Sequence, residues 1–394
     1  MARLHQTETL SVLGSPCLAA ALLVCSAEFP SLPTRRAYSS IYFGDGGLEL
    51  MNTGAINRRE FARAALAASA GLLASPEAGF SGQASPDQAS GMKVGLYTIT
   101  YLGIWYRGKA LTLEEVIGRA KKYGYDGVEV DGKPPHGHPL TLTRRHAREL
   151  RKMAEGEGLE IYGLAGNNDF SSPITEQRDA QLLYMRDLIQ LAPELGAKTV
   201  RVFLAWRGVT QKQGLASYSL SESLWETVHQ GFTPEETWEW CRDGMIQCAK
   251  FAGDAGVTLA LQNHKPVIHN HKDVLRMVKE VNSPHLKVSL DAYIMDDKSP
   301  AAIRQAALDV GPLQALSHFG GEFKREADGS VKGPDFYPPF VQAMRAIGYK
   351  GYVGYELCHT LPVVNGQTVG LEFADQCAEG AAIYMRGLIK ANSS

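Results

Sequence analysis

The chain has 394 residues, of which 44% are hydrophobic and 21% charged, a balance typical of a globular protein with one large domain or two small ones. Its formal net charge of -2 gives no electrostatic reason to expect a nucleic-acid or acidic-lipid partner. The six cysteines show no C-x-x-C spacing, so nothing in the sequence indicates structural zinc. The sequence carries no signal for the oligomeric state.

The first 90 residues do not have the pattern of a folded domain. Arg58 and Arg59 are followed by Phe61 and then by an uncharged run of Ala, Leu, Gly and Ser at 64–74. This pattern resembles a twin-arginine export signal, which implies a periplasmic or otherwise exported protein. A Sec-type signal at 18–27 is the alternative, but no basic stretch lies close ahead of that run.

The apolar runs near the start are shorter than the roughly 18–20 residues that a membrane span needs, so we expect no integral membrane segment in the mature chain. Met51 lies just upstream of the paired arginines, and we expect it to be the true initiator. We therefore expect residues 1–50 to be an over-extended or disordered start, residues 51–91 a signal with its linker, and residues 92–394 the folded domain.

From residue 92 onward, short apolar strands alternate with helical segments. Thr112 and Glu115 form a capping box for a helix that stops at Gly124, and Thr233-Pro-Glu-Glu236 opens a helix that stops at Gly256. Further helices are predicted at 143–157, 174–195, 336–347 and about 372–390. The predicted strands are 93–98, 126–131, 159–164, 198–204, 257–264, 286–291, 314–318 and 352–356.

This alternation predicts the fold class, an α/β protein with a (β/α)8 or TIM barrel. An open doubly wound sheet is the alternative, but its first strand would be followed by a Gly-rich phosphate-binding turn, and residues 98–103 do not form one. Residues 205–232 break the alternation without clear periodicity. We expect this long connection to form a lid or rim over the site.

The fifth predicted strand, V-T-L-A-L-Q-N-H at 257–264, is apolar on both faces until it ends in three polar side chains. Such a strand is typical of a buried parallel sheet, in which ligands bind beyond the carboxyl ends of the strands. The next three strands end in a comparable way, so four consecutive strands supply Gln262, Asp291, His318 and Glu356. Two carboxylates, an imidazole and an amide oxygen suit a divalent metal, with Mn²⁺ expected first and Mg²⁺, Co²⁺ or Zn²⁺ as alternatives.

The order and spacing of five short motifs carry a family resemblance. They are G-Y-D-G-V-E at 124–129, L-A-L-Q-N-H at 259–264, V-S-L-D at 288–291, L-S-H-F at 316–319 and G-Y-E at 354–356. Residues 92–390 resemble the sugar phosphate isomerase/epimerases, which are xylose isomerase-like barrels. The resemblance implies one divalent metal held by Glu, Asp, His and Glu from strands five to eight, at the positions of Gln262, Asp291, His318 and Glu356.

The chain departs from this family pattern at two positions. Gln262 can lend an oxygen to a metal but cannot exchange a proton as a carboxylate does, and Ile294 stands where the family's epimerases carry a histidine. We therefore expect Glu356 and His264 to be the catalytic residues. His264 lies on the same strand face as Gln262, and an imidazole suits proton transfer near neutral pH.

The leading hypothesis is a divalent-metal-dependent isomerase or epimerase that acts on a small-molecule carbohydrate. It would deprotonate a C–H of a keto sugar or cyclitol and stabilise the resulting enediolate. A site with a catalytic carboxylate on only one face of the substrate carbon also fits a keto-sugar or 3-keto-glycoside lyase or hydratase, similar to the inosose dehydratases of the family. A non-catalytic sugar-binding barrel is a third hypothesis, whereas DNA repair of the endonuclease IV type would need more metal ligands and a basic face.

Five further residues are candidate substrate contacts. One follows strand seven where the family often has a basic contact, and the others lie on strand two or follow strands three and four. For each, a structural or solvated role is the alternative. The candidates are Lys324, Glu129, Asn168, Trp206 and Arg207, and Asn167, beside Asn168, is expected to line the same pocket.

Overall fold

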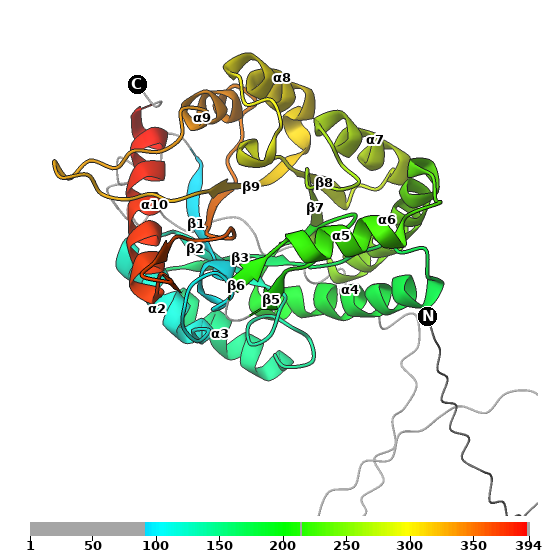
Figure 1. Ribbon diagram of the computed structural model, residues 1–394, viewed down its shortest axis with the longest axis horizontal. Coiled ribbons are helices and arrows are strands. Elements are labelled where there is room, and N and C mark those ends of the chain that lie inside the picture. The colour runs from blue at the N-terminus through cyan, green and yellow to red at the C-terminus, as the bar shows by residue number, and fades with distance from the viewer. Residues whose placement is uncertain (1–90, 213–214, 392–394) are drawn as a thin grey trace, which may run out of the picture. The chain divides into compact units, whose positions relative to one another are not determined.

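The computed structural model describes residues 91–212 and 215–391, in which eight parallel strands close into a barrel surrounded by helices (Figure 1). Hydrogen-bonded neighbours follow the order β1-β10-β9-β8-β7-β4-β3-β2, and β1 pairs with both β10 and β2. This closed order confirms the predicted (β/α)8 barrel and rules out the open doubly wound sheet. The barrel strands are β1 (Lys93–Tyr97), β2 (Gly127–Asp131), β3 (Glu160–Ala165), β4 (Thr199–Val202), β7 (Thr258–Gln262), β8 (Leu286–Ser289), β9 (Gln314–Gly320) and β10 (Tyr352–Glu356).

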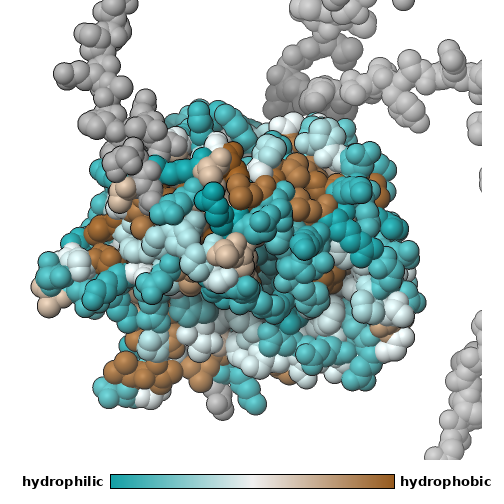
Figure 2. Space-filling model, turned by 90° about the horizontal axis from the view of Figure 1, so that it is seen from above, coloured by the Kyte–Doolittle hydropathy of each residue, from teal (hydrophilic) through white to brown (hydrophobic). Residues whose placement is uncertain are grey.

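The expected twin-arginine signal lies outside the described residues. Among the helices that the structure does describe, none is both long enough and apolar enough to span a bilayer. Figure 2 shows one face of this part of the chain, on which hydrophilic side chains predominate and hydrophobic side chains form separate patches.

Two helices begin and end at the caps that the sequence predicts. In α2 (Leu113–Tyr123) the Thr112 hydroxyl accepts from the Glu115 N–H while the Glu115 carboxylate accepts from the Thr112 N–H, and Gly124 ends the helix at φ 77°. The same box opens α6 (Pro234–Ala255). The other barrel helices are α3 (Arg144–Gly156), α4 (Thr175–Leu195), α7 (His271–Val281), α8 (Pro300–Val310), α9 (Tyr337–Ala346) and α10 (Leu371–Ala391).

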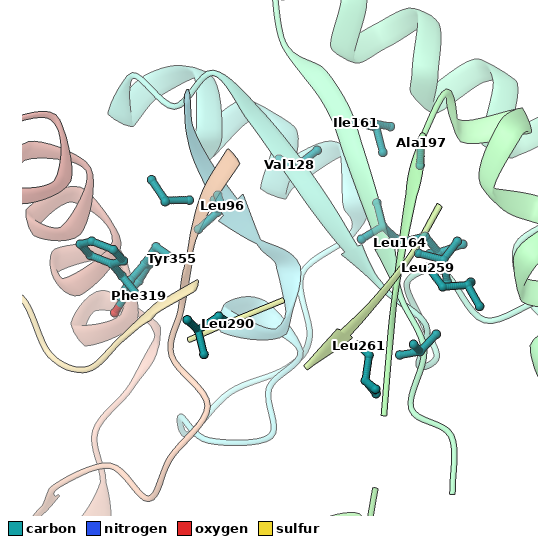
Figure 3. Close-up of a cluster of buried hydrophobic side chains, with 14 of the residues drawn as sticks. Leu96, Val128, Ile161, Leu164, Ala197, Leu259, Leu261, Leu290, Phe319 and Tyr355 are labelled. Carbon is teal, nitrogen blue, oxygen red and sulfur yellow. The ribbon is translucent and has the colours of Figure 1, made fainter. Parts of the chain in front are cut away.

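Apolar side chains on the outer face of the barrel form the core shown in Figure 3. Leu96 on β1, Val128 on β2 and Leu164 on β3 are buried there, and each is followed or preceded by a residue on the opposite face of its strand. Burial of each such side chain contributes roughly 1.5–3 kcal/mol. Because a register slip of one residue would turn this whole set toward the barrel interior and the polar residues outward, the core determines which side chains point into the barrel.

Two tyrosine rings fill the barrel interior near the amino ends of the strands. The rings of Tyr162 on β3 and Tyr352 on β10 stack with their centroids 3.9 Å apart. A Cβ atom at Gly95 would lie 2.3 Å from the Tyr162 ring, and one at Gly354 would lie 2.6 Å from the Tyr162 hydroxyl oxygen. Glycine is therefore required at both positions for the ring to cross the barrel.

The connection at 205–232 contains secondary structure that the sequence does not predict. A hairpin of β5 (Thr210–Lys212) and β6 (Leu215–Ser217) precedes α5 (Ser219–Val228) (Figure 1). The expectation of an aperiodic loop is wrong here because strands this short show no alternation and α5 has no buried apolar stripe. Tyr218 joins this segment to the barrel mouth, since its hydroxyl donates to the Cys358 carbonyl at 2.9 Å.

Candidate active site

The structure brings the four predicted strand-end side chains together inside the barrel mouth. Gln262, His318 and Glu356 lie on β7, β9 and β10, and Asp291 follows β8. Each of the four is at most 2% exposed. Gln262 Nε2 donates to Asp291 Oδ2, and His318 Nδ1 lies 3.1 Å from the same oxygen. Asp291 thus links the neighbouring side chains of β7 and β9.

Arg201 on β4 projects its guanidinium into this group. Its Nε donates to Glu129 Oε1 at 2.9 Å, and its Nη1 donates to Gln262 Oε1 at 3.2 Å. The same Nη1 lies 3.9 Å from Glu356 Oε2. Sequence reasoning missed Arg201, although an arginine inside the apolar strand T-V-R-V is itself a signal, because a buried guanidinium requires acidic or polar partners.

Glu129 on β2 bridges this arginine and the histidine. Its Oε2 lies 2.6 Å from His318 Nε2. Burial alone would raise the pKa of Glu129, but His318 and Arg201 hold that pKa below its usual value. Burial alone would lower the pKa of His318, but the carboxylates of Glu129 and Asp291 raise it. Glu129 therefore anchors both the Arg201 guanidinium and the His318 imidazole through its two carboxylate oxygens.

Glu356 presents a carboxylate oxygen that is not satisfied by the surrounding protein. Its Oε1 is buried and has no hydrogen-bond partner in the part of the chain that the structure describes. Burial raises the pKa of Glu356 to about 8, although Arg201 and a contact with the Cys358 thiol act in the opposite direction. A carboxyl group with a pKa in this range can both accept and release a proton near neutral pH.

A cavity of about 30 Å³ lies between these side chains and the covering connection. Arg201, Gln262 and Glu356 contribute polar atoms to its lining, and Trp206 and Tyr218 contribute aromatic rings. A water molecule needs at least roughly 10–15 Å³ of such space, so the cavity accommodates one or two waters and not a sugar. Binding of a sugar therefore requires side chains or segments over the mouth to move.

Asp131, at the end of β2, organises a second polar cluster beside the cavity. It accepts hydrogen bonds from the Tyr97 hydroxyl and from Asn167 Nδ2, the latter at 3.2 Å. Lys133 Nζ lies 3.3 Å from Asp131 Oδ2. Tyr97, Lys133 and Asn167 all line the cavity, and Lys133 Nζ also donates to Asn167 Oδ1, so the three side chains form one hydrogen-bonded polar wall of the cavity.

His264, one of the two predicted catalytic residues, also lines the cavity and is half-buried. Its ring lies 5.2 Å from the Phe203 ring and 5.3 Å from the Trp206 ring. Burial lowers the pKa of His264 to about 4, so its imidazole is neutral at neutral pH. Its Nδ1 lies 2.6 Å from the carbonyl oxygen of Lys265, which leaves Nε2 as the nitrogen available to a ligand.

The predicted substrate contacts after strand four have different positions. Trp206 lines the cavity. Arg207 instead forms an ion pair with Glu222 of α5, at 2.9 Å, and does not belong to the cavity lining.

Two other predicted contacts lie away from the cavity. Asn168 is fully buried and binds the Phe203 backbone with both amide atoms, at 2.6 Å and 3.1 Å, which holds the ends of β3 and β4 together. Lys324 pairs with Glu322 at 3.0 Å and lies 4.4 Å from the centre of the Phe373 ring. The structure therefore does not bring Asn168 or Lys324 into the cavity lining.

The predicted metal ligands do not fit a divalent ion as they are arranged. Such an ion needs several donor atoms that are free to point at one centre. Gln262 Oε1 accepts from Arg201 instead, and both ring nitrogens of His318 are within hydrogen-bond distance of carboxylates, Nδ1 of Asp291 and Nε2 of Glu129. Within residues 91–212 and 215–391, no three His, Cys, Asp or Glu side chains are grouped to hold a metal.

A closed (β/α)8 barrel with acidic, basic and imidazole side chains at its carboxyl-terminal mouth is the arrangement found in barrel enzymes. The family model described as xylose isomerase-like TIM barrel matches residues 117–377 of the chain. The chain therefore belongs to the xylose isomerase-like TIM barrel family, as the resemblance in its motifs indicates.

Two relatives with similar sequences are named as 3-epimerases. The fructoselysine 3-epimerase of Escherichia coli O157:H7 is 22% identical over 274 residues, which are 67% of this chain and 88% of the relative. The D-psicose 3-epimerase of Enterocloster bolteae is 22% identical over 293 residues, which are 73% and 87% of the two chains. The crystal structure of 3-keto-D-glucoside 4-epimerase from E. coli, in its apo form, has the same fold, with a TM-score of 0.53, 20% identity, and coverage of 75% of this chain and 99% of that chain.

Proposed function

We propose that this chain is an exported sugar epimerase or isomerase that removes a proton from the carbon beside the carbonyl group of a keto sugar or cyclitol. The observation that carries the proposal is the buried Oε1 of Glu356, which has no partner among the described residues and belongs to a side chain lining the cavity. Relatives named as 3-epimerases of sugars, although only 22% identical, support the same class of reaction.

Glu356 has the properties of a general base for this reaction. With a pKa of about 8, roughly a tenth of the Glu356 side chains are ionised at pH 7, and this carboxylate is more basic than an ordinary one and so better able to take a proton. Lys133 and Asn167 lie in the same cavity lining and can bind the hydroxyl groups of the sugar. Their contacts would orient the reacting carbon toward Glu356.

Epimerisation also needs a proton donor on the other face of the reacting carbon. Gln262 cannot serve, because an amide neither donates nor accepts a proton as an acid or base does. His264 is the remaining proton-handling group of the predicted set in the cavity lining, and its neutral imidazole has a free Nε2. We assign His264 to return or relay the second proton.

The unequal pair of Glu356 and His264 favours a second candidate function. In β-elimination, one group removes a proton and another protonates the leaving hydroxyl or glycosidic oxygen, so two different groups are what the reaction requires. A lyase or hydratase acting on a keto sugar or a 3-keto-glycoside would use the same proton-removal step. The nature of the product distinguishes the two activities.

The proposed reaction uses no metal, because the atoms of Gln262 and His318 expected to bind Mn²⁺, Mg²⁺, Co²⁺ or Zn²⁺ are already paired with protein groups. Localisation enters only through the twin-arginine pattern. An exported enzyme would meet free sugars and glycosides, and we propose these over phosphorylated substrates.

Proton exchange is the direct test. The protein is incubated in D₂O with a panel of ketohexoses, inososes and 3-keto-glucosides, and loss of the C–H signal beside the carbonyl is followed by NMR together with any new products. We expect exchange with at least one member of the panel and none with Glu356→Gln, and circular dichroism checks that this variant is folded. Sugar binding by calorimetry without exchange or elimination would instead support a non-catalytic sugar-binding barrel.

A further inference from the structure

Arg201 places a permanent positive charge at the centre of the barrel mouth. Its side chain is 3% exposed, and it contacts Glu129, Gln262 and Glu356 from three other strands. We infer that the Arg201 guanidinium stands in this chain where a divalent ion would otherwise be held, and that the enzyme works without a resident metal. The catalytic half of this inference rests on the proposed function, whereas its metal-binding half can be tested alone.

The guanidinium is held firmly in this position. One edge donates to Glu129 at 2.9 Å and the other to Gln262 at 3.2 Å. The guanidinium carbon also lies 4.3 Å from the centre of the Tyr97 ring and 5.3 Å from that of Phe203, within the range of cation–π attraction. An ion could displace Arg201 only by taking from the buried carboxylate of Glu129 one of its two partners, since His318 alone would remain beside it, and this is unfavourable.

Gln262 is matched to the arginine and not to a metal. Its Oε1 accepts from Arg201 while its Nε2 donates to Asp291. A carboxylate at this position could accept from Arg201 but would meet the Asp291 carboxylate with no proton between them. The amide also carries one negative charge fewer than a glutamate, which corresponds to the exchange of a doubly charged ion for a singly charged guanidinium.

Unpaired atoms show where a substrate would meet this charge. Arg201 Nη2 and Glu356 Oε1 are both buried without a hydrogen-bond partner among the residues that the structure describes, and both side chains line the cavity. A keto oxygen that accepts from Nη2 would bring the neighbouring C–H within reach of Glu356. Two complementary unpaired groups in one cavity therefore form a site for a carbonyl and the carbon next to it.

The reaction is balanced with these groups alone. Glu356 takes the proton, the C–H electron pair forms the C=C bond of the enediolate, and the carbonyl π pair moves onto the oxygen. The negative charge that develops on this oxygen lies against the guanidinium, which stabilises it without reorganising. Return of a proton to carbon reverses the electron movement and restores a keto sugar, so neither an oxidant nor a reductant is consumed.

Metal binding by the purified protein tests the inference without a substrate. The wild-type chain is dialysed against EDTA, titrated with Mn²⁺ by calorimetry, and heated with and without Mn²⁺. We expect no stoichiometric binding and no rise in melting temperature. Binding of one Mn²⁺ per chain that is lost in Asp291→Asn would overturn the inference.

A designed change should convert the mouth into a metal site. Arg201→Met combined with Gln262→Glu removes the guanidinium and supplies a carboxylate, so we expect this double variant to bind one Mn²⁺ and to melt at a higher temperature when Mn²⁺ is present. Arg207→Met is the matched control, since it removes an arginine that does not line the cavity, and it should gain no binding. If the double variant does not fold, Arg201→Gln with Gln262→Glu replaces it. A folded variant of this kind that binds no Mn²⁺ would show that Arg201 is not what excludes the ion.

Proton exchange then tests the catalytic half. Wild-type exchange should be unaffected by EDTA, and Arg201→Ala should lose about 100-fold or more, as expected when a group that stabilises an oxyanion is removed. Added guanidinium ion should restore part of the Arg201→Ala activity. Inactivation by EDTA that Mn²⁺ reverses would overturn the inference. If no sugar exchanges with any form, the proposed function fails, while the Mn²⁺ titrations still decide whether the mouth holds a metal.

Discussion

Removal of Arg201 should destabilise the fold by an amount that depends on Glu129. The two side chains are at most 3% exposed, and Nε lies 2.9 Å from Oε1. Loss of one partner of a buried ion pair costs about 3–5 kcal/mol, chiefly because the other charge is left buried and uncompensated. Here His318 stays 2.6 Å from the second oxygen of Glu129, so for Arg201→Met we expect a loss near the lower end, about 3 kcal/mol.

Urea unfolding of a double-mutant cycle measures this dependence. Glu129→Gln alone should also destabilise, because it leaves the guanidinium buried with a weaker partner. In the Arg201→Met background the same change removes an uncompensated charge, so we expect the double variant to be more stable than the sum of the single losses by about 1–3 kcal/mol. Single losses that add to within roughly 0.5 kcal/mol would refute the claim that the pair is coupled.

Three further changes test individual side chains. Because burial raises the pKa of Glu356 to about 8, the exchange rate should rise with pH through about 8 and then level off, and a rate that falls over this range would contradict its role as base. Glu356 also binds its proton more tightly in the folded state than in the unfolded chain, where its pKa is about 4.3. Its stabilising contribution is therefore complete below that pH and is lost as the pH rises toward 8. Urea unfolding at several pH values should show that Glu356→Gln abolishes this decrease in the free energy of unfolding. The Tyr162 hydroxyl is buried without a partner in the described part of the chain, so Tyr162→Phe should leave the free energy of unfolding unchanged or raise it by up to about 1 kcal/mol, and a loss above about 2 kcal/mol in urea unfolding would indicate a partner. Asn168→Ala should cost about 1–3 kcal/mol in the same assay because two Phe203 backbone groups lose their partner, and no loss would show that this contact does not hold β3 to β4.

The barrel could be predicted from the sequence because local signals and burial agree along most of the chain. Capping boxes at Thr112 and Thr233 mark where two helices begin, and Gly124 and Gly256 mark where they end, all as the structure shows. Strand ends were predicted to within about two residues, the error typical of boundaries read from patterns. The hairpin and the helix within residues 205–232 were not predicted. These elements are short and mostly exposed, so their sequences show no regular spacing of apolar residues.

The candidate site could be predicted only in part. Gln262, Asp291, His318 and Glu356 were found because each ends an apolar strand, and parallel strands bring such ends together. Arg201 was missed because it lies within its strand and not at its end, and because its partner Glu129 is 72 residues away on β2. That pairing depends on β2 and β4 lying on either side of β3, so that the two side chains meet inside the barrel mouth, which no local pattern reveals.

The residues proposed to carry out the reaction and the residues that would select the substrate lie on different parts of the structure. Arg201, Gln262 and Glu356 lie on barrel strands whose register is set by parallel pairing and by the buried outer core, so the groups that would act on a carbonyl are held rigidly. Trp206 and Tyr218 lie on the connection that covers the mouth, and with them in place the cavity measures only about 30 Å³. Under the proposed function, a sugar would have to displace part of this cover to reach the guanidinium, so the connection would test its size and substituents before the reaction begins. Substitutions in residues 205–232 should therefore change which sugars bind, whereas substitutions at the strand positions should change the rate for every sugar that does.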